Sequence, residues 1–139
     1  MKKLSASLVI VAALVLIATA AFHASGYGSI ANQIESSSAP TFLKKAMPTL
    51  WLFFSWHLLV VAVGSIAALR LGRAARPVLL ACAVVVVGDF FWVHSIAGLF
   101  AGTVLLLFAG LLLFAGGWLA RGALTGAPKV KAPANSEPS

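Results

Sequence analysis

Two residues, His57 and Asp89, combine an ionisable side chain with a strongly apolar setting. Asp89 lies in the stretch VVVVGDFFWVHS (84–95), and the chain has only three acidic residues in all. A buried charge is costly unless it is paired, so this carboxylate needs a partner. A histidine-aspartate pair inside a membrane could fix helix register, orient a metal-bound imidazole or relay protons. His57 and Asp89 are therefore the candidate catalytic residues.

The chain has two further histidines, His23 and His94. Imidazole nitrogens ligate haem iron and transition metals, so His57, His94 and His23 are the candidate cofactor-binding residues. In this hypothesis His57 is the principal ligand, His94 or His23 is another, and Asp89 orients an imidazole. The pattern does not distinguish haem from a transition metal.

The amino-acid composition indicates whether these residues are surrounded by water or by a lipid membrane. Of 139 residues, 61% are hydrophobic and 9% are charged, against roughly 25% charged in an average soluble domain. A soluble fold of this size could not keep so much apolar surface from water. The chain is therefore expected to be an all-α membrane protein whose first partner is the lipid bilayer. The net charge of +7 is explained by basic residues that flank the membrane, so nucleic-acid binding is not expected.

The apolar runs predict a four-helix transmembrane bundle, with helices over residues 1–23, 48–70, 77–95 and 97–120. As one helix, residues 77–119 would be on the order of 65 Å long, about twice the ~30 Å thickness of the hydrocarbon core. The run must fold back, and HSIAG (94–98) is the expected turn. Open backbone groups are not tolerated in lipid, so each run is helical.

Three other segments join or follow these helices. Residues 24–47 are expected to form an outer loop, in which Thr41–Met47 is suited to an interfacial helix. Residues 71–76 form a basic cytoplasmic loop, and residues 121–139 a disordered cytoplasmic tail rich in Pro, Ala and Ser. A signal peptide is the alternative for residues 1–23. Their apolar run exceeds the usual length of a signal core, which favours a retained helix.

Basic residues predict the orientation, because cytoplasmic segments are enriched in Lys and Arg. With the N-terminus inside, the outer side carries only Lys44 and Lys45. The inner side carries Lys2, Lys3, Arg70, Arg73, Arg76, Arg121, Lys129 and Lys131. Both termini are therefore expected to be cytoplasmic, in a membrane of the bacterial inner (plasma) membrane kind.

This topology predicts that His57 and Asp89 meet. At about 1.5 Å per residue, His57 lies roughly 13 Å and Asp89 roughly 9 Å below the same outer boundary. His94 is about 140° around the helix from Asp89, so we expect it at the turn, facing water or headgroups. His23 closes the first helix on the same side. Aromatic residues near this level are expected from the interfacial belt.

Cysteine and glycine residues add two constraints. The single cysteine, Cys82, excludes an internal disulfide and a Cys-x-x-Cys redox pair. In the fourth helix Gly98, Gly102 and Gly110 form a stripe of small residues that permits close helix packing. The spacing fits a contact with the third helix and a contact with a partner equally well.

Three functions remain in competition. The first is a structural or accessory subunit of a larger membrane assembly or a homo-oligomer, in which His57 and Asp89 fix helix register. The second is a haem- or metal-binding redox or isomerase protein. The third is a proton-coupled carrier of a small or lipophilic solute, with the pair as a proton relay. Whether the protein is an enzyme stays open at this point.

Overall fold

The computed structural model describes residues 2–120, which are helical almost throughout and contain no strand. Met1 and the predicted tail over residues 121–139 lie outside the described residues. The elements are α1 (Lys2–Ser25), α2 (Tyr27–Glu35), α3 (Thr41–Ala68), the short helix η1 (Gly72–Ala74), α4 (Ala75–Ala97) and α5 (Ala101–Leu119).

Within residues 2–120, four segments are long and apolar enough to cross a membrane, which confirms the prediction of an all-helical architecture with four candidate spans. They are Lys3–Glu35, Thr41–Ala68, Gly72–Ala97 and Ala101–Leu119. The first comprises α1 and α2, and the third comprises η1 and α4.

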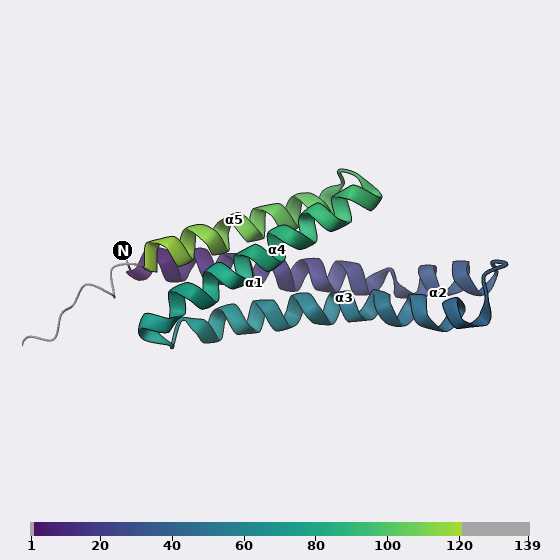
Figure 1. Cartoon of the computed structure of the whole chain (residues 1–139), viewed down its shortest axis with the longest axis horizontal. Coiled ribbons are helices and arrows are strands. Elements are labelled where there is room, and N and C mark those ends of the chain that lie inside the picture. The colour runs from purple at the N-terminus through teal and green to yellow at the C-terminus, as the bar shows by residue number, and fades with distance from the viewer. Residues whose placement is uncertain (1, 121–139) are drawn as a thin grey trace, which may run out of the picture.

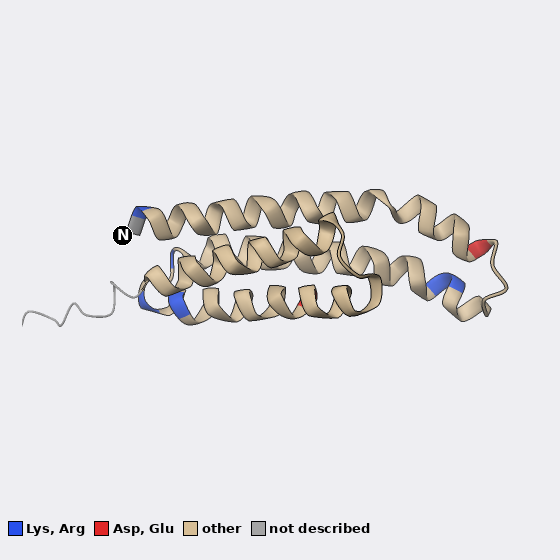
Figure 2. Cartoon of the chain, turned by 90° about the horizontal axis from the view of Figure 1, so that it is seen from above, with Lys and Arg blue, Asp and Glu red and all other residues tan. Residues whose placement is uncertain are grey.

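The spans form two antiparallel hairpins, one from α1 and α3 and one from α4 and α5 (Figure 1). Helix α1 packs against both α3 and α5, and α5 packs against both α1 and α4. Helix α4 meets α3 much more sparsely. The start of α1 and the end of α5 lie at one end of the bundle, whereas α2 and the start of α3 project beyond the turn between α4 and α5 (Figure 1). Lysine and arginine residues gather at the two ends (Figure 2).

The core runs along the line where α1 meets the other helices. Its largest fully buried apolar side chains are Val9, Leu16, Leu58, Leu79, Val86, Leu106 and Leu113. At one end of the core, the Ser5 hydroxyl donates a hydrogen bond of 2.7 Å to the Gly116 carbonyl oxygen. A Cβ atom at Gly116 would stand 2.7 Å from Cγ2 of Val9, so the glycine is what lets α1 and α5 approach so closely.

The predicted outer loop, residues 24–47, is largely helical. It holds the end of α1, all of α2 and the first turns of α3, so α3 begins at Thr41 rather than at Pro48. Proline normally breaks a helix because it lacks an N–H group. Pro48 nevertheless lies inside α3, where it cannot supply the N–H that another residue would donate to the Lys44 carbonyl, and the Thr49 hydroxyl donates to the neighbouring Lys45 carbonyl at 3.0 Å. The Thr41–Met47 segment thus forms the first turns of α3 and is not a separate helix.

The predicted glycine stripe serves different purposes along its length. Gly98 is not in a helix: it follows α4 with φ of 72°, a backbone conformation that favours glycine, and turns the chain towards α5. Gly102 is buried under the ring of Phe100. Gly110 faces α4, where a Cβ atom would stand 2.7 Å from Cγ2 of Val87. The stripe therefore includes the internal contact between α4 and α5.

Candidate functional site

His57 of α3 and Asp89 of α4 form a hydrogen-bonded pair. Nε2 of His57 lies 3.0 Å from Oδ2 of Asp89. The side chains are 32% and 21% exposed, respectively, so neither is sealed inside the core. The bond joins the two hairpins across the pair of helices that otherwise contact each other sparsely. A polar link at this place restricts how far α4 can move from α3.

A second polar cluster surrounds His23 in the last turn of α1. Nδ1 of His23 lies 3.0 Å from the buried Ser55 hydroxyl, and its ring stacks on Trp51 with centroids 3.9 Å apart. The indole N–H of Trp51 donates to the His23 carbonyl oxygen at 2.7 Å. A Cβ atom at Gly26 would stand 3.1 Å from this indole. The cluster thus fastens the end of α1 to α3 and satisfies a carbonyl group at the helix end.

Phe54 separates the two histidines of this region. Its ring centroid lies 5.0 Å from that of His23 and 6.3 Å from that of His57. His23 and His57 consequently have different polar partners, Ser55 for the first and Asp89 for the second.

His94 occupies a third position. It belongs to the last turn of α4, and its ring stacks on that of Phe90 with centroids 5.5 Å apart. Its Nδ1 atom is buried without a hydrogen-bond partner. We expected His94 at the turn; α4 continues to Ala97, so His94 lies inside the helix, and its imidazole packs on an aromatic ring.

The candidate ligands do not converge on one point. Within residues 2–120 there is no group of three or more His, Cys, Asp or Glu side chains that could hold a metal ion. His57, His94 and His23 are each placed in separate surroundings, as described above. A shared set of metal ligands made from the three histidines is therefore not present in this arrangement.

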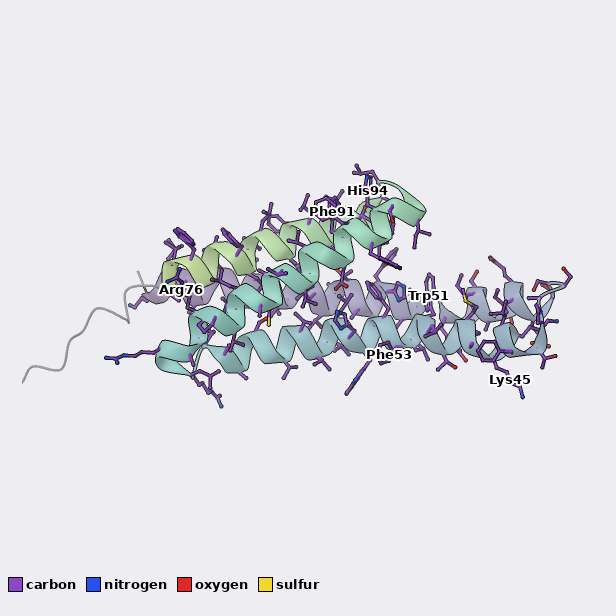
Figure 3. The ribbon with its side chains drawn as sticks, viewed as in Figure 1. Lys45, Trp51, Phe53, Arg76, Phe91 and His94 are labelled. Atoms are coloured by element: carbon purple, nitrogen blue, oxygen red, sulfur yellow. The ribbon has the colours of Figure 1, made fainter. Side chains whose placement is uncertain are left out.

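A cavity of about 690 Å³ lies between the two hairpins, beyond the His57 and Asp89 pair. Its walls come from the last turns of α1 and α4, from Trp51 and Phe54 of α3, and from the start of α5. Phe54 precedes His57 by three residues and Val93 follows Asp89 by four, so the pair lies about one helical turn from the cavity wall. Figure 3 shows Trp51 beside this region and His94 near the far end of α4.

Cys82, the chain's single cysteine, packs half-buried against the core. Such a thiol behaves as a small apolar side chain. It lies outside the cavity and outside both polar clusters.

Comparison with protein-family models, with curated proteins and with solved structures gave no match for this chain. The site must therefore be interpreted from its own geometry.

Sequence reasoning missed the His23 cluster and the cavity. The cluster had a usable signal, because His23 ends the first helix on the side where Trp51 and Ser55 begin the second. The cavity had no such signal, since it depends on how the two hairpins diverge.

Proposed function

We propose that this chain is a small multi-pass integral membrane protein that serves as a structural or accessory subunit of a membrane assembly. In this proposal the hydrogen bond between His57 and Asp89 holds the two hairpins in register. The observation that carries it is the 3.0 Å contact between α3 and α4, which pack against each other much more sparsely than α1 packs against α3 or α4 against α5. Polar contacts between membrane helices commonly have this stabilising use.

The proposed membrane is the bacterial inner membrane, with both termini in the cytoplasm. Support comes from the basic residues, which favour the end of the bundle where α1 starts and α5 ends. Helix α1 is proposed to be kept as the first span, because it supplies Val9, Ala12, Ala13 and Leu16 to the core.

The proposed assembly, a homo-oligomer or a larger complex, would use the outer face of α4. Only 17% of the apolar window of this span is buried, against 44% for α5. Val84 and Phe91 are 70% and 63% exposed. Large side chains of this kind pack against lipid or against another membrane helix.

Blue-native electrophoresis of gently solubilised membranes tests the assembly. We expect a band well above that of the 14.4 kDa chain in its detergent micelle, and a shift to lower mass in Phe91→Ala. Phe108→Ala is the matched control, because Phe108 is also exposed but lies on α5. A monomer-sized band from wild-type membranes would contradict the assembly proposal and leave the His57 and Asp89 bond to be judged by its own test.

A proton-coupled carrier is the second candidate, favoured by one observation. The His57 and Asp89 pair lies about one turn from a large cavity, and both side chains keep some exposure. A pair so placed could exchange protons with a bound solute. Proton flux in liposomes tests this function: a solute-driven flux that disappears in Asp89→Asn but persists in Glu35→Gln would favour the carrier over the structural subunit.

The haem- or metal-binding function has less support, because the three histidines do not form a shared set of metal ligands and haem would have to bind through one of them. An absorption spectrum and metal analysis of the purified protein test it directly. A Soret band or stoichiometric metal that disappears in His57→Ala would establish a cofactor protein.

A further inference from the structure

The cavity between the hairpins has the size and lining of a ligand site. Small-molecule sites in proteins commonly measure about 300–1,000 Å³ and carry apolar and aromatic walls with a few polar groups. This cavity measures about 690 Å³. Its aromatic lining residues are Phe22, Trp51, Phe54, Trp92 and Phe100. They come from both hairpins, so a ligand here would touch both.

The lining carries no Lys, Arg, Asp or Glu among the described residues, and His23 is its one titratable side chain. A phosphate or carboxylate head group would therefore find no countercharge in the cavity. An uncharged molecule fits this lining, because removing an unpaired charge from water is costly.

Most polar groups of the lining already have partners. The Thr19 hydroxyl donates to the Val15 carbonyl, the Ser25 hydroxyl to the Phe22 carbonyl, and the Trp51 indole to the His23 carbonyl. The exceptions are Nε2 of His23 and the indole N–H of Trp92, which make no hydrogen bond within residues 2–120.

The free nitrogens of His23 and Trp92 belong to α1 and α4, on opposite hairpins. His23 is held in place by Ser55 and by the stacked ring of Trp51. A ligand oxygen that bonds Nε2 of His23 would thus meet a nitrogen whose orientation is already fixed, which lowers the entropy cost of binding.

Access to the cavity is apolar. Phe22, Trp92 and Ile96 line it and are 66%, 73% and 75% exposed on the outside of the bundle. In a bilayer, exposed side chains of this kind at a cavity rim would contact lipid at the level of the interfacial belt. A lipophilic molecule dissolved in the membrane could enter from the side without crossing a polar barrier.

From these observations we infer that the cavity binds an uncharged lipophilic molecule with a planar ring and an oxygen that hydrogen-bonds to His23. Quinones and phenols with apolar tails belong to this class. The aromatic walls contact the ring, and offset or edge contacts between rings add to simple burial. This inference goes beyond the proposed structural role and does not depend on it.

Decylubiquinone, a quinone with a short alkyl tail, is the probe for a binding test. The full chain in nanodiscs of neutral lipid is titrated while tryptophan fluorescence is recorded, since a bound quinone quenches nearby indoles. We expect saturable quenching with one quinone per chain. Trp51→Phe and Trp92→Phe should remove most of the saturable part, because these indoles line the cavity. Trp118→Phe should retain it, because Trp118 is not a lining residue.

Two further variants separate binding from partition into the lipid. Ala97→Phe places a ring in the cavity wall and should weaken binding at least tenfold, whereas Ala81→Phe makes the same change at an exposed position of α4 outside the cavity and should leave binding unchanged. His23→Ala should weaken binding about five- to tenfold, the effect of one lost hydrogen bond. Circular dichroism checks that each variant keeps its helices.

Two results would overturn the inference. The first is quenching that rises linearly with quinone and is equal in Ala97→Phe and Ala81→Phe, which means partition alone. The second is native mass spectrometry that finds one phospholipid retained by the wild type and lost in Ala97→Phe, which assigns the cavity to a lipid chain.

Discussion

Removing either member of the His57 and Asp89 pair should destabilise the bundle, and removing both should cost less than the sum. Interhelical polar pairs in membranes contribute about 0.6 kcal/mol on average and about 1.7 kcal/mol at most. The two side chains are 32% and 21% exposed, so neither reaches the limit of full burial. We expect a coupling free energy of about 1 kcal/mol, which is about a fivefold change in the unfolding equilibrium.

The two single variants should differ. His57→Leu leaves the Asp89 carboxyl group without a partner in apolar surroundings, which costs about 1–3 kcal/mol. Asp89→Leu removes the acidic group and leaves a partly exposed imidazole, so its cost should be about 1 kcal/mol or less. A larger loss of unfolding free energy in His57→Leu than in Asp89→Leu would therefore show that Asp89 needs its partner more than His57 does.

Reversible unfolding in mixed micelles of a mild detergent and dodecyl sulfate, followed by tryptophan fluorescence, gives the four free energies of the cycle. Val60→Ala and Val85→Ala form a control cycle, because both side chains are exposed on the same two helices, at 51% and 42%. A coupling within about 0.3 kcal/mol of the control would refute the reasoning that this bond holds the hairpins together.

Three other changes give defined outcomes. Gly116→Ala should lower the free energy of unfolding by about 1–3 kcal/mol, because its Cβ would stand 2.7 Å from Val9 and 3.3 Å from the Ser5 carbonyl. The control is Gly88→Ala, whose Cβ would have nothing within 4 Å and which should be neutral or slightly stabilising. Equal losses of stability in the two variants would contradict the tight contact at Gly116. Because the three histidines have separate surroundings, metal analysis of the purified protein should find no stoichiometric zinc or copper, ions that need several such ligands. Stoichiometric metal that is lost in His57→Ala would contradict this. The orientation is tested on intact spheroplasts in a Cys82→Ala background. An impermeant maleimide should label Ser37→Cys and spare Leu71→Cys, since these exposed residues lie just beyond the opposite ends of α3. Labelling of Leu71→Cys and not of Ser37→Cys would contradict the proposed orientation.

Much of the fold could be predicted because membrane-spanning helices correspond to uninterrupted apolar runs in the sequence. The third and fourth predicted helices lie close to α4 and α5, and the turn between them falls at Gly98. The start of α3 could not be predicted, since proline is a common first residue of a helix and placed the predicted start at Pro48. Pro48 is the eighth residue of α3, and the Lys44 ammonium donates to the Glu35 carbonyl at the end of α2 at 2.6 Å, which ties the turns before Pro48 to α2.

Part of the candidate site could likewise be predicted from the sequence, and part of it could not. The contact between His57 and Asp89 follows from depth along two antiparallel helices, which depends only on rise per residue. The role of His94 does not follow, because its surroundings depend on where α4 ends and on the position of Phe90. The cavity is least predictable, since it arises where the outer ends of two hairpins separate, and residue periodicity carries no information on that separation.

The most direct test of the central claim is solid-state NMR of the protein in lipid bilayers. Asp89 is the single aspartate of the chain, so labelling aspartate with 13C at Cγ and histidine with 15N in the ring gives an unambiguous carboxyl signal. We predict a dipolar coupling from this carbon to one imidazole nitrogen, as a 3.0 Å contact between Nε2 and Oδ2 requires, and its loss in His57→Gln but not in His94→Gln. Absence of the coupling in the wild-type protein, or its survival in His57→Gln, would contradict the pairing on which this account depends.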